Sequence, residues 1–185
     1  MKRPLKLLPN ARGGRSRINR APSPFLVMAM PWLTIVLASL APSLPIMVPL
    51  PLLPPLGFML LLAWVQVRPG LLPVWAGLPL GALDDLYSGQ PFGSAILLWS
   101  LAMIASDLIE ARFPWRSFLT EWLIASAMIA GYLAAGLAIA NTAGGQTPFW
   151  TILPQLLLTM LFYPAAGRAV AVFDRLRLAP LRVLR

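Results

Sequence analysis

Residues 77–97, with the sequence GLPLGALDDLYSGQPFGSAIL, carry a small or acidic residue at every fourth position between apolar flanks. These residues are Gly77, Gly81, Asp85, Gly89 and Gly93. Each residue of an α-helix advances by about 100°, so a spacing of four holds successive residues near one face. The stretch is therefore a stripe on one helix, an acidic active site or a helical hairpin, and the surrounding sequence has to distinguish them.

The composition indicates an all-α integral membrane protein. Of 185 residues, 58% are hydrophobic and 11% are charged, whereas a soluble domain carries roughly 25% charged residues. The sequence has no cysteine and no histidine, which excludes disulfides, thiol nucleophiles, histidine bases and the commonest metal ligand within this chain. We therefore predict no catalytic residues, no metal site and no cofactor.

Six apolar segments are predicted to be transmembrane helices. Their approximate ranges are 24–41, 54–67, 71–87, 91–111, 117–140 and 149–173. Six prolines lie between residues 42 and 55, and proline is disfavoured inside helices but favoured in their first turn. We therefore expect a short second helix that begins at Pro54 or Pro55, preceded by an apolar non-helical segment. The first segment lacks a clear cleavage site, so we expect it to be retained.

The distribution of basic residues predicts the orientation. All fifteen Lys and Arg residues fall before the first segment, after the second, after the fourth, or from Arg168 onward. Because basic residues concentrate on the cytoplasmic side of membrane proteins, six spans with both termini in the cytoplasm are expected. The chain then divides into a basic leader at 1–23, a six-helix membrane domain at 24–174 and a basic tail at 175–185. We expect the basic tails to contact membrane lipids and not nucleic acid.

Local sequence signals predict that residues 77–97 form a helical hairpin. The sequence YSGQP interrupts the apolar pattern, Gly89 suits a left-handed helix end, and Pro91 suits the first turn of the next helix. The hairpin would lie on the non-cytoplasmic side. Gly77 and Gly81 would let another helix approach closely, and Gly93 would do the same at the top of the following helix.

The two adjacent acids are predicted to have different environments. Asp85 shares the face of the glycines and is expected to point into the bundle, close to the free amides at the start of the next helix. It is either a cap that locks the hairpin or a contact for a ligand, ion or partner, and we favour the cap. Asp84 is rotated by about 100° and is expected to reach headgroups or water. Adjacent helical positions diverge too far to share a proton as a catalytic dyad does.

Three further acids fall at the predicted cytoplasmic ends of helices. They are Asp107, Glu110 and Glu121. We expect them to pair with Arg68, Arg112 or Arg116, and such surface pairs contribute little stability. The alternative is a docking patch for a cytoplasmic partner.

The hairpin residues resemble the signature of the rod-shape-determining MreD family. The stretch GLPLGALDDLYSGQPFG is similar to that family's pattern of Gly, Gly, Asp, Gly and Gly at intervals of four, with Asp85 at the acidic position. The short proline-initiated second helix, the basic loop VRPG and Pro164 within the last helix support the resemblance. Asp84 departs from it, because the position before the acid is usually apolar in the family.

The resemblance implies a non-enzymatic inner-membrane subunit of the bacterial cell-elongation machinery. Such a subunit would bind the bitopic protein MreC and help to couple cytoplasmic MreB filaments to peptidoglycan synthesis by RodA and its penicillin-binding transpeptidase. The family is similar in fold to the S subunits of energy-coupling-factor vitamin transporters. An alternative function is therefore that of a small-molecule-binding S-type subunit of a membrane transporter.

Overall fold

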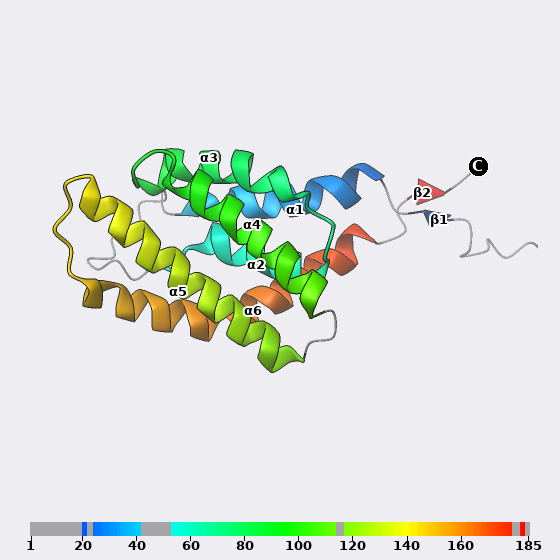
Figure 1. Ribbon diagram of the computed structural model, residues 1–185. Coiled ribbons are helices and arrows are strands. Elements are labelled where there is room, and N and C mark those ends of the chain that lie inside the picture. The colour runs from blue at the N-terminus through cyan, green and yellow to red at the C-terminus, as the bar shows by residue number, and fades with distance from the viewer. Residues whose placement is uncertain (1–19, 22–23, 42–52, 114–116, 179–181, 184–185) are drawn as a thin grey trace, which may run out of the picture.

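The computed structural model describes residues 20–21, 24–41, 53–113, 117–178 and 182–183. Within these residues the chain forms a bundle of six α-helices (Figure 1). Their bounds are α1 Pro24–Ser39, α2 Leu56–Val67, α3 Gly77–Ser88, α4 Ser94–Arg112, α5 Phe118–Thr142 and α6 Leu153–Arg177. Short 3-10 helices precede α3 (η3, Val74–Ala76) and α6 (η4, Phe149–Ile152). A two-residue antiparallel pair, β1 (Arg20–Ala21) with β2 (Arg182–Val183), lies where α1 begins and α6 ends.

The predicted start of α2 is confirmed, and the start of the third helix differs from its prediction. Pro55 is the N-cap of α2. The third helix was expected from residue 71, but Pro73 has an extended backbone with ψ 150° and the chain becomes helical only at Val74. A proline disfavours helical geometry at the residue before it, so Leu72 is a poor position from which to continue a helix into Pro73. Pro79 accordingly lies in the first turn of α3, where its missing N–H is tolerated.

Three segments are long and apolar enough to cross a membrane. They are Ser94–Arg112, Phe118–Thr142 and Phe149–Arg177. α1 is a shorter apolar helix, and α2 and α3 have 12 residues each, which corresponds to about 18 Å at 1.5 Å per residue. The predicted leader, apart from Arg20–Ala21, and the proline-rich residues 42–52 lie outside the described residues.

The short helix α2 lies at the centre of the bundle. It packs on α1, α4, α5 and α6, and Figure 1 shows it behind α4, between α3 along the top and α5 and α6 along the bottom. Its Phe58 stacks on Tyr132 with ring centroids 4.2 Å apart and contacts Trp99 at 6.0 Å. Seven of its 12 residues are buried, so this helix is surrounded mainly by protein. Its length is therefore set by its neighbours more than by the thickness of a bilayer.

Two prolines inside helices leave backbone carbonyls that other helices satisfy. Pro164 in α6 cannot donate to Met160, and the indole Nε1 of Trp122 on α5 donates to that carbonyl at 3.0 Å. Pro31 in α1 likewise cannot donate to Val27, whose carbonyl accepts from Nη1 of Arg177 at 2.9 Å. An unpaired carbonyl is costly in an apolar environment. The two prolines thus create attachment points for α5 on α6 and for α6 on α1.

Candidate functional site

The two helical glycines of the motif allow α3 to contact α4 through its backbone. A Cβ atom on Gly77 would lie 2.8 Å from the backbone of Ser100, and one on Gly81 would lie 2.6 Å from the carbonyl oxygen of Ala95. Both distances are shorter than any real Cβ contact, and both obstacles are backbone atoms that cannot rotate away. The predicted close approach is confirmed, and the approaching helix is α4.

The turn between the helices depends on two glycines with positive φ. Gly89 ends α3 with φ 70°, as predicted. The N–H of Ser94 donates to the carbonyl of Pro91 at 3.0 Å, and this closes a four-residue turn with Gly93 (φ 97°, ψ −13°) in its third position. That position of a type II turn needs a positive φ, which favours glycine.

Two predictions about this turn are therefore wrong. Pro91 was expected in the first turn of the fourth helix, but it precedes the left-handed Gly93, and α4 begins only at Ser94. Gly93 was expected to allow close helix packing, but no atom outside its own chain neighbours lies within 4 Å of a Cβ built there. Its role in the structure is conformational.

Asp85 binds the N-terminal end of α4. One carboxylate oxygen, Oδ2, accepts from the amides of Gly93 at 2.8 Å and Ile96 at 3.2 Å. The other, Oδ1, accepts from the amide of Ala95 at 2.8 Å and the hydroxyl of Ser94 at 3.2 Å. The cap predicted from the sequence is present, and it is made by a residue of the preceding helix.

This cap compensates for the absence of a local one. The N-cap residue of α4 is Gly93, which has no side chain to accept from the first amides. A carboxylate at a helix N-terminus also interacts favourably with the helix dipole, and hydrogen bonds to an ionised acceptor are stronger than neutral ones. Asp85 thus lies near the unfavourable end of its own helix but at the favourable end of the next.

Asp84 is buried, contrary to the prediction that it reaches headgroups or water. Its exposed fraction is 7%. The helix α3 packs on α1 as well as on α4, so the face next to Asp85 is covered too. Asp84 lies near Ser39 of α1 and Tyr132 of α5. It forms no salt bridge with a described residue.

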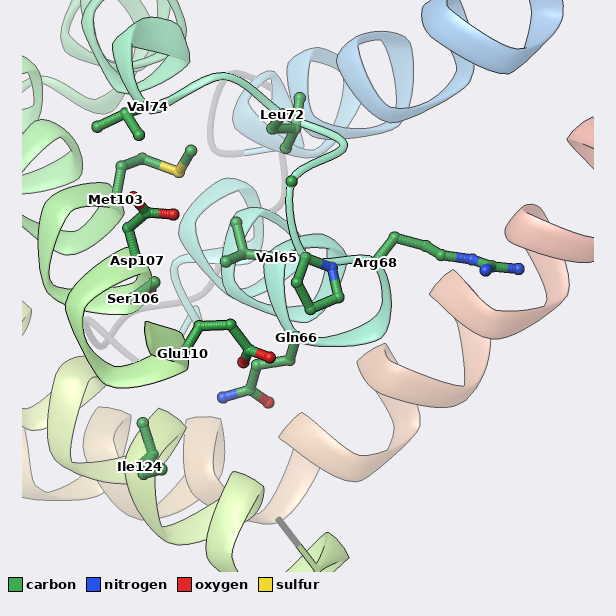
Figure 2. A pocket seen from close by; sticks show the side chains of 12 residues that line it. Val65, Gln66, Arg68, Leu72, Val74, Met103, Ser106, Asp107, Glu110 and Ile124 are labelled. Carbon is green, nitrogen blue, oxygen red and sulfur yellow. The ribbon is translucent and has the colours of Figure 1, made fainter. Parts of the chain in front are cut away.

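The acids at the opposite end of the bundle do not pair with Arg68 as predicted. Figure 2 shows Asp107 and Glu110 of α4 beside a small cavity of about 30 Å³ under the loop that follows α2, while the Arg68 side chain extends away from them towards α6. Arg68 pairs instead with Asp174. Arg116 lies outside the described residues. The expected pairing with Arg68 rested on a common level in the membrane, and the direction of the Arg68 side chain overrides it.

Asp174 is the centre of a charged cluster that the sequence analysis missed. Arg68 reaches it through Nη2 at 2.8 Å and Nε at 2.9 Å, and Arg177 reaches it through Nη2 and Nε, both at 2.7 Å. Arg177 also lies over the ring of Trp64, 5.5 Å from its centroid, in cation–π geometry. The cluster therefore joins the ends of α1, α2 and α6. One signal was available: Asp174 and Arg177 are three residues apart in a helical sequence, where oppositely charged side chains meet.

The hydrogen bond to Asp174 raises the pKa of Arg68, which stays charged at physiological pH. The two well-bonded carboxylates, Asp85 and Asp174, are each occupied by several donors from the protein. These hydrogen bonds and ion pairs hold helices in position. Because its oxygens already accept from several donors, neither carboxylate is free to act as a general base.

Comparison with known proteins identifies one family. The sequence model of one family, described as rod shape-determining protein MreD, matches residues 20–166, and the match includes the whole of α1 to α5 and the hairpin motif. No curated protein and no solved structure matches the chain.

Proposed function

The chain belongs to the rod shape-determining MreD family, and from this premise we propose that it is a non-enzymatic scaffold of the bacterial cell-elongation machinery. The observation that carries the proposal is the family match over the hairpin, in which Gly77, Gly81 and Asp85 hold α4 on α3 and the two positive-φ glycines form the turn between them. A hairpin whose capping carboxylate, Asp85, is fully used in joining two helices suits a binding and positioning role.

We place this scaffold in the inner membrane with six spans and both termini in the cytoplasm. The helices α4, α5 and α6 have the length and composition of spans, and the central position of α2 favours counting the shorter helices as spans within the protein. The Arg68–Asp174–Arg177 cluster then lies at the cytoplasmic end and the α3–α4 hairpin at the periplasmic end.

Topology reporters test this arrangement directly. We expect a reporter inserted after Gly89 to be active in the periplasm and one inserted after Arg116 to be active in the cytoplasm. The reverse pattern, or the same side for both, contradicts the six-span arrangement.

The proposed partners are a bitopic MreC-like protein and, directly or through it, MreB filaments and RodA with its penicillin-binding transpeptidase. In this role the chain supports peptidoglycan synthesis along the cell cylinder. Depletion of the protein from a rod-shaped host should produce round cells, and the protein purified in mild detergent should retain the MreC-like partner. Unchanged rods with an unchanged rate of wall synthesis after depletion refute the proposal.

A transporter S-type subunit remains the second candidate because of one groove. It has a volume of about 220 Å³ and is lined by polar side chains that include Gln90, Thr151 and Gln155. Several polar side chains on an otherwise apolar wall are what a small-molecule site needs, and the volume is slightly below the roughly 300–1,000 Å³ of ordinary sites. Co-purification with an ATPase module and a tightly bound vitamin would support the transporter instead.

A further inference from the structure

Arg168 is an isolated cation on a helix that is otherwise apolar around it. It lies nine residues before Arg177, the last residue of α6, or about 14 Å along the helix axis. Its side chain is exposed and forms no salt bridge with a described residue. Arg168 is one of the bases that the six-span arrangement places on the cytoplasmic side, where lipid headgroups meet the protein. Its exposed guanidinium is therefore available to an anionic group of a membrane lipid.

Arg168 lines a groove that also contains a carboxylate. The groove has a volume of about 430 Å³ and lies between α2, α5 and α6, which are neighbours in the bundle (Figure 1). Glu121 of α5 lines the same groove and likewise forms no salt bridge with a described residue. The groove thus offers one cation and one anion that are not paired with each other.

The remaining lining suits the glycerol and acyl part of a lipid. Phe118 and Trp122 are aromatic side chains at one end of α5, and Ala63 and Ala171 add apolar surface. Aromatic side chains are typical of the membrane interface. Gly167 leaves the wall of α6 open, because no atom lies within 4 Å of a Cβ built there. Gln66 and Tyr163 are bonded to each other at 2.8 Å, and the indole of Trp122 is bonded to Met160. The two charged side chains are therefore the polar groups of the groove that have no salt bridge within the described residues.

We propose that this groove binds one phospholipid whose headgroup carries both a phosphate and an ammonium. The phosphate contacts the guanidinium of Arg168, and the ammonium contacts the carboxylate of Glu121. This complementarity distinguishes a zwitterionic headgroup from a purely anionic one, which would leave Glu121 facing a negative charge. The inference rests on the membrane placement proposed above and not on the role in cell shape.

Native mass spectrometry of the full chain in detergent tests the proposal. The protein is incubated with equal amounts of phosphatidylethanolamine and phosphatidylglycerol that have identical acyl chains. We expect the unsubstituted chain to retain phosphatidylethanolamine in preference, and Arg168→Gln to lower its retention roughly tenfold through the loss of a charge-assisted contact. Glu121→Gln should still bind lipid but lose the preference for phosphatidylethanolamine.

A glycine pair provides the steric control. Gly167→Leu adds a side chain to the wall of this groove, where the new Cβ meets no atom within 4 Å, and should abolish retention. Gly131→Leu adds the same side chain to α5 outside this groove, with its Cβ equally unobstructed, and should not. Preference for phosphatidylglycerol, or equal retention by Gly167→Leu and Gly131→Leu, overturns the proposal. So does a photo-crosslinker at position 167 that captures a protein in cells and not lipid.

Cell shape separates this inference from the proposed function. If Gly167→Leu loses the lipid but still restores rods to depleted cells, the lipid is bound but is not needed for shape. If the chain retains the lipid as expected and depleted cells stay rod-shaped, the proposed function fails and the lipid site stands.

Discussion

Asp85 and Asp174 lie at opposite ends of the bundle and hold helices together with different partners. Asp85 accepts from the amides that begin α4, eight to eleven residues further along the chain. Asp174 binds the side chains of Arg177, three residues away, and of Arg68, 106 residues away. The first arrangement is local and uses the backbone, while the second is mostly long-range and uses side chains. This difference determines which substitutions disrupt each arrangement and how easily each arrangement is predicted from the sequence.

The largest effect is expected at the charged cluster. Asp174→Asn removes the anion from Arg177, whose side chain is 4% exposed, and leaving one buried charge without its partner costs roughly 3 kcal/mol. Thermal unfolding in detergent measures this loss, with Asp107→Asn as the control because Asp107 is exposed. Arg68→Gln should have a smaller effect than Arg177→Gln, since the Arg68 side chain is 48% exposed. Equal losses of stability in the two arginine variants would show that burial of the side chain does not determine how much each arginine stabilises the protein.

The next largest effect is expected at the hairpin, where adjacent acids should respond with different signs. Asp85→Asn replaces a charged acceptor of several hydrogen bonds and should cost about 2 kcal/mol of stability. Asp84→Asn should cost nothing or stabilise, because it removes a buried charge that lacks a cationic partner among the described residues. The amount of folded protein recovered from membranes gives a second measure. A loss at Asp84 as large as that at Asp85 contradicts the assignment of the cap to Asp85 alone.

A smaller loss is expected when the contact between α3 and α4 is widened. Gly81→Ala places a methyl group against the carbonyl of Ala95, and overpacking of this kind costs about 1–3 kcal/mol. Gly167→Ala meets no neighbour and should stabilise α6 by roughly 0.5–1 kcal/mol through the backbone entropy of glycine. The two unfolding midpoints should therefore move in opposite directions.

The smallest effect is expected at the long-range bond to the carbonyl that Pro164 leaves free. Trp122→Phe removes the indole N–H that satisfies Met160 and should cost about 1 kcal/mol. The cost should shrink in a Pro164→Ala background, because alanine supplies its own backbone N–H to that carbonyl. A double-mutant cycle measures this coupling, and additive effects would mean that the indole bond does not replace the missing backbone bond.

The hairpin was largely predictable from the sequence because its determinants are close together. The spacing of Gly77, Gly81 and Asp85, and the helix-ending Gly89, each follow from local geometry. The exact start of α4 was not predictable. Pro91 and Gly93 are compatible either with the first turn of a helix or with a type II turn before it. Which one forms depends on the amides that donate to the Asp85 carboxylate.

The second buried acid and the charged cluster could not be derived in the same way. The burial of Asp84 depends on α1 covering a second side of α3, and the pairing of Arg68 with Asp174 depends on α2 lying beside α6. Periodicity defines the faces of a helix but does not state how many neighbours cover them. Such contacts required the three-dimensional arrangement.

The bond between Arg177 and the carbonyl of Val27 joins residues 150 positions apart. A chain is synthesised from its N-terminus, so the first helix is made with a gap in its own bonding that persists until the last helix arrives. A chain that stops before Arg177 therefore carries a defect in α1, far from its broken end. The last residue of α6 thus completes the hydrogen bonding of the first helix.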